Sequence, residues 1–506
     1  MLFNSYAFIF GFLPVVWVAF FLIGRASPAA ASGWLALSSL AFYGWWSPTS
    51  LPLLMGSICV NYVFGRMLTP AEGSNAEPSK ALLVGAIGAN LALLGFFKYA
   101  DFFVVNANVA LAAANVGQMQ ALDLLLPVGI SFFTFTQIAF LADCWQGKVR
   151  ERNFAHYTLF VTYFPHLVAG PVLHHAQMMP QFAGRHIYRI DWDKVGLGMA
   201  VFTVGLAKKL LIADPLGEYS DSLFSSVEQG FVPMLFTAWC GVLAYAFQIY
   251  FDFSGYSDMA IGISLFFGIR LPHNFASPYR ATSIIDFWRR WHISLSTFLR
   301  DYLYIPLGGN RLGKWRRYLN LLITMLLGGL WHGANWTFVL WGAAHGLLLV
   351  INYAWRRIWG EPRKNPSAAA TVAGWGLTFV AVCFTWVLFR AETVGAALTV
   401  MRGMAGLNGI SVPDHWSERL AALPLLIADQ GWFQGMFQPN PLNLLVPLAF
   451  GFAVLFCPNM NALSVGGYVM RQKYLAAKAF LVGALFCLCL IDLLQSTSPQ
   501  FLYFQF

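Results

Sequence analysis

Long runs of apolar residues alternate with short polar segments along almost the whole chain of 506 residues. Runs of 17 or more residues recur from end to end, and a helix of that length crosses about 30 Å of hydrocarbon. Because some runs are short enough to be re-entrant, the pattern predicts roughly 11 to 13 transmembrane or re-entrant helices. The candidate spans lie near 4–23, 34–46, 50–68, 80–97, 101–116, 122–142, 154–171, 196–213, 233–251, 319–331, 336–355, 370–389, 442–457 and 476–494.

The composition places these helices in a membrane. Hydrophobic residues make up 58% of the chain and charged residues only 10%, whereas a soluble chain has about a quarter of its residues charged. No segment is large and polar enough to fold alone in water. We therefore predict an all-α polytopic membrane protein in which residues 1–506 form a single membrane-embedded domain.

The net charge of +9 comes from short basic clusters between the apolar runs, at 148–152, 270–317, 356–364 and 471–478. No basic stripe with interleaved aromatic residues occurs, which excludes nucleic-acid binding. Under the positive-inside rule these clusters mark cytoplasmic loops. Residues 403–470 hold one basic residue, Arg419, against three acidic ones, so a loop at about 403–441 is predicted outside the cytoplasm.

The first apolar run resembles a signal peptide, because SPAAAS follows it. No positive charge precedes it, however, and Arg25 follows it, which favours a retained first span with an external N-terminus. One span separates the last basic cluster from the C-terminus, so that end is also predicted to be extracytoplasmic. We expect a multi-pass protein of the cell inner membrane.

The seven cysteines lie mostly within apolar segments, and no C-x-x-C pair occurs. They are typical of small core residues and support neither a disulfide framework nor a zinc site. No cluster of His, Asp and Glu has metal-ligand spacing either, so no metal site is predicted.

An ionisable residue, His332, lies within LLGGLWHGANW at 326–336. The 37 residues from Leu319 to Trp355 carry no charged side chain and lie between two basic clusters, so they must enter the membrane and return as a hairpin. If the segment is helical, His332 lies about 20 Å deep, near the turn. An ionisable side chain at that depth more often marks a reaction or transport path than a structural contact. A histidine bonded to a carbonyl is the alternative.

The segment 283–305, SIIDFWRRWHISLSTFLRDYLYI, is amphipathic and basic, which favours a helix at the cytoplasmic interface. Ser283 with Asp286 resembles a capping box. The spacing of Asp286 and Arg290, and that of Trp288 and His292, predicts i, i+4 contacts.

Six motifs follow one another along the chain: LPVGISFFTFTQIAFLAD, HLVAGPVLHH, QIYFDFSGYSDMAIG, DFWRRWHISLSTFLRDYLYIPLGGNR, GGLWHGANWTFVLWGAAHG and FLYFQF. Together they resemble the membrane-bound O-acyltransferase family, in its bacterial alginate O-acetyltransferase branch. They cover most of the chain in family order, with a motif core at 122–390. One departure is HH at 174–175 after the AGP turn, where members usually carry a strongly basic residue. The resemblance implies helices packed around a central tunnel.

The resemblance also assigns roles. The near-universal histidine of the family falls on His332 and its second motif histidine on His292. A neutral buried imidazole is the form that serves as a general base. Asp301 and Asp252 are candidate orienting groups, although a structural pairing is the alternative for each. The residues expected to hold the phosphates of a donor are Arg289, Arg290, Arg300 and Lys314.

The resemblance implies an O-acyltransferase that moves an acetyl group from cytoplasmic acetyl-CoA across the inner membrane to an exported polysaccharide of the alginate or cellulose type. Acetyl-CoA is then a co-substrate, and no tightly bound cofactor is expected. The partners implied are membrane lipid and a periplasmic acetyl-transfer protein. Two alternatives stay open: transfer of D-alanine or another acyl group from a carrier-protein thioester to a cell-wall polymer, and transport of a polysaccharide precursor.

Overall fold

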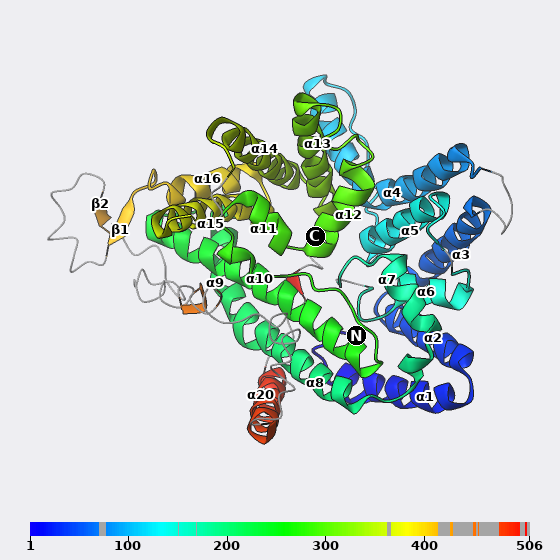
Figure 1. The fold of residues 1–506 in the computed structure, drawn as a ribbon. Coiled ribbons are helices and arrows are strands. Elements are labelled where there is room, and N and C mark those ends of the chain that lie inside the picture. The colour runs from blue at the N-terminus through cyan, green and yellow to red at the C-terminus, as the bar shows by residue number, and fades with distance from the viewer. Residues whose placement is uncertain are drawn as a thin grey trace. The chain divides into compact units, whose positions relative to one another are not determined.

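The computed structural model describes residues 1–69, 77–149, 151–167, 170–361, 366–412, 426–428, 449–451, 454, 475–495 and 501–502. Helices dominate this part of the chain, and a short parallel pair of strands, β1 (Ile410–Val412) and β2 (Leu426–Ala428), accompanies them (Figure 1). The chain packs into two compact units, each built from separate stretches of sequence. The predicted all-α class is confirmed.

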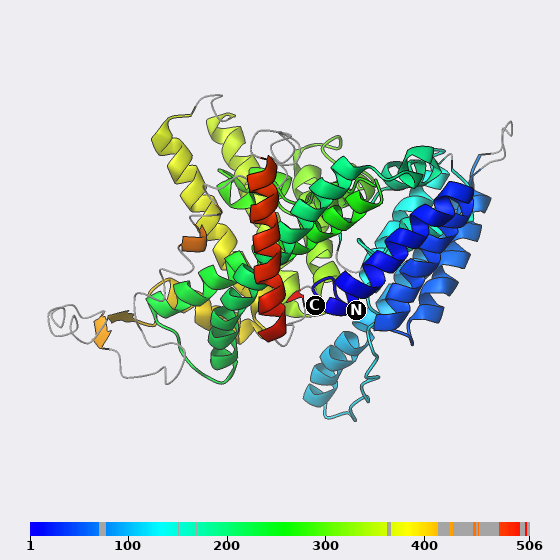
Figure 2. The same cartoon turned by 90° about the horizontal axis from the view of Figure 1, so that it is seen from below.

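The first unit comprises Met1–Leu206, Tyr256–His273 and Ser464–Gln505. In it the N-terminal helices run side by side, drawn in blue in Figure 2. Its elements are η1 (Ala7–Phe12), α1 (Leu13–Ala26), α2 (Pro28–Trp46), α3 (Leu51–Leu68), α4 (Lys80–Ala113), α5 (Ile130–Trp145), α6 (Phe154–Thr162), α7 (His175–Ala183), η2 (Arg185–Tyr188), α8 (Trp192–Ala207) and α20 (Leu475–Gln495).

The second unit comprises Ala207–Gly255, Asn274–Leu463 and Phe506, and it holds every residue that we singled out for chemistry. The long α10 (Leu235–Phe266) contributes to both units. The other helical elements of this unit are η3 (Lys208–Ala213), α9 (Asp214–Glu228), η4 (Pro278–Arg280), α11 (Ile284–Arg290), α12 (Ile293–Leu299), η5 (Arg300–Tyr304), α13 (Lys314–His332), α14 (Trp336–Trp359), α15 (Ala368–Arg390) and α16 (Val394–Met404).

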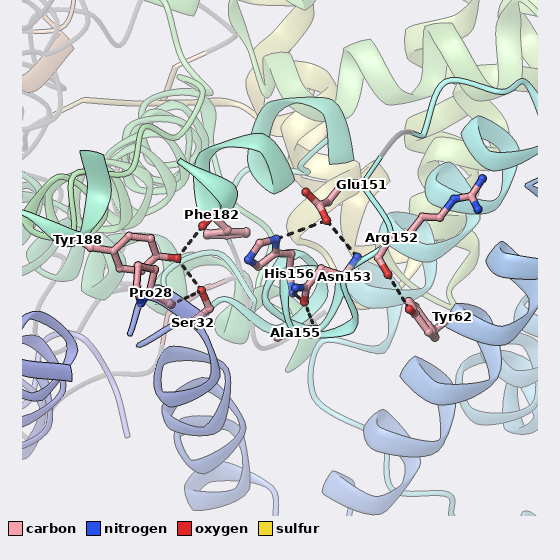
Figure 3. A network of polar contacts seen from close by, with 10 residues as sticks. All are labelled: Pro28, Ser32, Tyr62, Glu151, Arg152, Asn153, Ala155, His156, Phe182 and Tyr188. Carbon is pink, nitrogen blue, oxygen red and sulfur yellow. Dashed lines mark hydrogen bonds and ion pairs between the residues drawn. The ribbon is translucent and has the colours of Figure 1, made fainter. Parts of the chain in front are cut away.

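Local sequence explains where many of these helices begin. A side-chain oxygen at the N-cap accepts a backbone N–H of the first turn, which satisfies a donor that the helix itself leaves without a partner. Ser27 does so for α2, Ser79 for α4 and Thr393 for α16. Asn153 caps α6 through two such bonds, beside the loop in which the Tyr62 hydroxyl donates to the carbonyl of Arg152 (Figure 3).

Within the described chain, seven helices are long and apolar enough to cross a membrane. Together with the shorter apolar helices, such as α5 and α16, they make the chain a multi-pass membrane protein. The seven are Ala7–Ala26, Leu51–Leu68, Lys80–Ala113, Trp192–Glu228, Trp336–Trp359, Ala368–Arg390 and Leu475–Leu494.

Some predicted boundaries were wrong. The runs 80–97 and 101–116 form one helix, α4, because the charged residues between them find partners without breaking it: Lys98 donates to the Ser131 hydroxyl, and Asp101 accepts from the backbone of 122 and 124. The predicted span 122–142 begins as a helix only at Ile130, after Gly129 in a left-handed conformation. Most of 442–457 and of the predicted external loop lies outside the described residues.

Candidate active site

The hairpin predicted around His332 is present. α13 ends at His332, and α14 begins three residues after Gly333, with the Asn335 side chain accepting the backbone N–H of Thr337. The two helices touch through backbone. A Cβ on Gly329 would lie 2.3 Å from the carbonyl oxygen of Phe338, and one on Gly342 would lie 2.4 Å from that of Met325. Glycine is therefore required for this close packing, which sets the position of the histidine.

His332 lies among aromatic rings and is 8% exposed. The rings of Trp331, Trp341 and Phe389 stand edge-on to its imidazole, with centroids 4.9, 5.2 and 5.0 Å away. Trp341 and Phe389 come from α14 and α15, so three helices build this environment.

His292 lies in the break between α11 and α12 and is almost fully buried. Its backbone is left-handed, with φ of +41°. Two contacts of Asn274 hold the following residues: the Asn274 carbonyl accepts the N–H of Ile293, and its side chain accepts the hydroxyl of Ser294 at 2.6 Å. The tertiary structure thus holds His292 in a conformation that non-glycine residues seldom adopt.

The ring of His292 packs edge-on against Phe253 at 4.7 Å. Neither ring nitrogen has a hydrogen-bond partner within the described chain. Burial lowers the pKa of His292 to about 3, so its imidazole is neutral at physiological pH. A buried polar group with no partner among the protein's own atoms is one that a bound ligand can satisfy.

The predicted i, i+4 contact between Trp288 and His292 was wrong. α11 ends at Arg290, two residues before His292, and the left-handed His292 then changes the direction of the chain. Trp288 instead donates its indole N–H to His345 at 3.3 Å. The predicted pair of Asp286 and Arg290 is confirmed at 2.9 Å. Of the predicted capping box, the bond from the Asp286 backbone N–H to the Ser283 hydroxyl is present.

Trp331 links the two histidines. Its ring centroid lies 4.9 Å from that of His332 and 6.5 Å from that of His292. The structure thus brings both candidate catalytic residues, 40 positions apart in sequence, into one cluster of rings. The other members of this aromatic cluster are Trp288, Trp291, Trp341, His345, Trp386 and Phe389.

The four basic residues expected to bind the donor phosphates differ in whether they already pair with other groups of the protein. Arg290 pairs with Asp286 and also donates to the carbonyl of Ala276. Arg300 donates two hydrogen bonds to its neighbour Asp301, at 2.7 and 3.0 Å, which raise the pKa of Arg300. Arg289 and Lys314 are exposed, at the ends of α11 and α13, and make no ion pair within the described residues.

The two candidate orienting carboxylates have cationic partners. Asp301 is engaged by Arg300. Asp252 is buried on α10 and lies 2.8 Å from Nζ of Lys209, which also lies 2.6 Å from Asp214. The sequence reasoning missed Lys209, although a lysine inside the predicted span 196–213 was a visible signal of an internal charge pair.

A second buried pair was also missed. In the first unit, Nδ1 of His175 lies 3.0 Å from Asp143, and both side chains are about 6% exposed. These residues lie in two of the motifs noted above, at the end of α5 and the start of α7. Within the described residues, no three His, Cys, Asp or Glu side chains are arranged to hold a metal ion.

Comparison with known proteins identifies the family of this chain. Residues 131–391 match the model of the membrane-bound O-acyltransferase family. The chain is 43% identical over 440 residues to "Peptidoglycan O-acetyltransferase" of Helicobacter pylori, covering 81% of both proteins. It is 42% identical over 405 residues to "Probable alginate O-acetylase AlgI" of Pseudomonas putida, covering 80% of both.

A more distant relative is "Teichoic acid D-alanyltransferase" of Streptococcus thermophilus, 29% identical over 46% of this chain and 59% of that protein. The matched region spans both histidines and the hairpin that carries His332. This is a multi-pass membrane acyltransferase of the alginate and peptidoglycan O-acetylase type. The chain belongs to the membrane-bound O-acyltransferase family.

Proposed function

We propose that this protein takes an acetyl group from acetyl-CoA at the cytoplasmic face of the inner membrane and delivers it for O-acetylation of an exported polysaccharide. One observation carries the proposal: His332 ends α13 at the turn of a helical hairpin and shares Trp331 with a second buried histidine. The relatives whose names describe O-acetylation support acetyl as the group that is transferred.

His332 is the proposed general base. A neutral imidazole takes the proton of an acceptor hydroxyl as its oxygen attacks the thioester carbonyl. The new C–O bond forms, the C–S bond breaks, and the proton passes to the departing thiolate. Positioned proton transfer of this kind contributes about 10²–10⁴ in rate. The aromatic rings around His332 exclude water that would otherwise compete as acceptor.

His292 is proposed to act on the carbonyl oxygen. Because its ring is neutral, one nitrogen carries a proton and can donate it to the negative charge that develops on that oxygen. Its ring nitrogens have no partner in the described structure, so a ligand would satisfy a group that is costly to leave without one.

The donor phosphates are proposed to meet Arg289 and Lys314 first, since these side chains are exposed and make no ion pair in the described residues. Arg290 and Arg300 have carboxylate partners and would have to exchange them for phosphate, which weakens their contribution. We further propose external N- and C-termini and a periplasmic partner that completes delivery to the sugar.

The test uses purified protein in proteoliposomes, with acetyl-CoA inside and a polysaccharide acceptor plus the periplasmic fraction outside. We expect thiol release and acetylated polymer in the wild type and loss of both in His332→Ala. His273→Ala, a half-buried histidine of the first unit, is the matched control. Full acetylation by His332→Ala would overturn the assignment of the base.

The same assay separates the alternatives. Alginate and peptidoglycan glycan strands, offered in turn, identify the acceptor. A D-alanyl carrier protein in place of acetyl-CoA tests the second donor class, which the teichoic acid relative represents only distantly. Movement of a sugar precursor without consumption of any thioester would contradict the proposed acetyl transfer from acetyl-CoA.

A further inference from the structure

A surface pocket of about 720 Å³ opens in the first unit, where η2 leads into α8. No step of the proposed acetyl transfer uses it. Basic side chains dominate its wall, contributed by Arg185, Arg189 and Lys194, with His186 and Trp192 beside them. Its lining residues come from one continuous stretch, Arg185 to Lys194, which the turn from η2 into α8 folds around a single space.

The acidic residues of the pocket do not cancel its charge. Lys194 and Asp191 neutralise each other, with Nζ 3.4 Å from the carboxylate and the Lys194 backbone N–H donating to the same side chain. The remaining lining charges are then one negative, from Asp193, and two positive, from Arg185 and Arg189. Arg185 and Arg189 are exposed and make no ion pair within the described residues. The pocket therefore presents a net positive charge with two guanidinium groups available to a ligand.

The wall that carries the arginines is held in place. The Tyr188 hydroxyl, at the end of η2, lies 2.6 Å from both the Phe182 carbonyl and the Ser32 hydroxyl of α2 (Figure 3). The side-chain amide of Gln181 bonds the backbone of Arg270 twice, at 2.9 and 3.0 Å. A ligand would meet a site whose backbone is already ordered, which lowers the entropic cost of binding.

Trp192 is the first residue of Trp192–Glu228, a segment long and apolar enough to span a membrane, and it is 69% exposed. Exposed tryptophan at the end of a span is typical of the headgroup level of a bilayer, where lipid phosphates lie.

We infer that this pocket binds the phosphate headgroup of an anionic phospholipid of the surrounding membrane. Arg185 and Arg189 contact the phosphate oxygens, for which the planar guanidinium is well suited. The exposed indole of Trp192 lies beside the upper part of the acyl chains. Coenzyme A offers phosphates too, but the apolar Trp192 and the position at the end of a span favour a ligand that is itself part of the bilayer.

The experiment measures retained lipid by native mass spectrometry of the full protein. Delipidated protein in neutral detergent is titrated with phosphatidylglycerol, with phosphatidylcholine and with coenzyme A, each alone. We expect one phosphatidylglycerol adduct per chain in the wild type. The double variant Arg185→Ala/Arg189→Ala is expected to bind it about 30-fold more weakly. The matched control is Arg66→Ala/Arg357→Ala, two exposed arginines at the ends of α3 and α14.

Each outcome has a defined meaning. Phosphatidylglycerol binding that is lost in the pocket variant and kept in the control supports the inference. Equal binding by both variants, or equal binding of phosphatidylcholine, overturns it. If coenzyme A and not lipid depends on the two arginines, the pocket is a donor site and the lipid assignment is wrong. Because the readout is binding, it is independent of whether the protein transfers acetyl groups.

Discussion

Two features of His292 reduce the free energy of unfolding. A left-handed backbone costs a non-glycine residue about 1–2 kcal/mol, and a buried polar group without a partner costs about 1–3 kcal/mol more. Asn274 supports the backbone conformation, because it bonds the two residues that follow His292. Lys209 shows the opposite situation, a buried charge that is fully engaged by two carboxylates.

The pH dependence of stability reports the burial of His292. Burial lowers its pKa to about 3 from the ordinary 6.5, so the unfolded chain binds a proton below pH 6.5 that the folded chain does not. The stability from the neutral ring is complete above pH 6.5 and decreases as the pH falls. Between pH 6.5 and 5 the free energy of unfolding is expected to drop by about 2 kcal/mol on this account.

Denaturant unfolding of the wild type and of His292→Gln at each pH measures this contribution. The glutamine does not titrate, so the variant is expected to lose about that much less stability on acidification. Identical pH dependence in the two proteins would contradict the prediction. Because every other titrating group is shared, the difference between the proteins isolates His292.

Lys209→Met is expected to destabilise the protein by about 3–5 kcal/mol, because it leaves Asp214 and Asp252 beside each other without their cation. Thermal unfolding in detergent measures the change. Adding Asp214→Asn and Asp252→Asn to Lys209→Met is expected to restore much of the stability, since no buried charge then remains. If Lys209→Met alone is as stable as the wild type, the pairing of Lys209 with the two carboxylates contributes nothing to stability.

At the scale of elements, the α13–α14 hairpin positions the candidate base. Its helices touch at Gly329 and Gly342, where a side chain would meet backbone atoms that cannot rotate away. α11 and α12 are two short helices separated by a break, and His292 lies in that break. Trp331 connects the two, because its ring lies against both histidines.

Gly329→Ala is therefore expected to force the helices apart, at a cost of about 1–3 kcal/mol in the free energy of unfolding. Acetyl transfer is expected to fall at least tenfold, because a shift of about 1 Å in a catalytic group costs that much or more. Gly376→Ala is the matched control: it lies on α15, and a Cβ there meets nothing within 4 Å. Equal activity of the two variants would show that the close packing does not position His332.

At the scale of the whole molecule, the charge distribution sets how the chain lies in the membrane. Basic residues gather at the ends of spanning helices, as with Arg66 on α3 and the pair Arg356 and Arg357 on α14. Positive loops remain in the cytoplasm during insertion. The proposed donor is cytoplasmic and the proposed acceptor external, so this orientation decides whether the chemistry is possible.

Labelling of single cysteines in cysteine-free protein tests the orientation. A cysteine at Arg357 or Lys314 is expected to react with an impermeant maleimide only in inverted membrane vesicles, because both positions belong to basic clusters that the positive-inside rule predicts to be cytoplasmic. A cysteine introduced next to Met1 is expected to react in intact spheroplasts. Labelling of Lys314→Cys from the outside would exclude a cytoplasmic entry for the donor beside α13.

The sequence alone was enough to predict the membrane class and the family, and it singled out the two histidines whose catalytic roles stay predictions. Apolar run length and charge bias are local quantities, and the motifs around His292 and His332 are contiguous. The hairpin could be predicted because an uncharged segment between two basic clusters has to return to the side from which it entered. The Ser283 cap and the Asp286–Arg290 pair could also be predicted, because each depends on residues only three or four positions apart in one helix.

Only the tertiary structure decided the contacts between distant segments. The left-handed turn at His292 is followed by two residues that bond to Asn274, and the partners of Lys209 come from two further helical segments. A one-dimensional pattern records which side chains avoid water. It does not record which of them meet, because that depends on how the helices pack against each other.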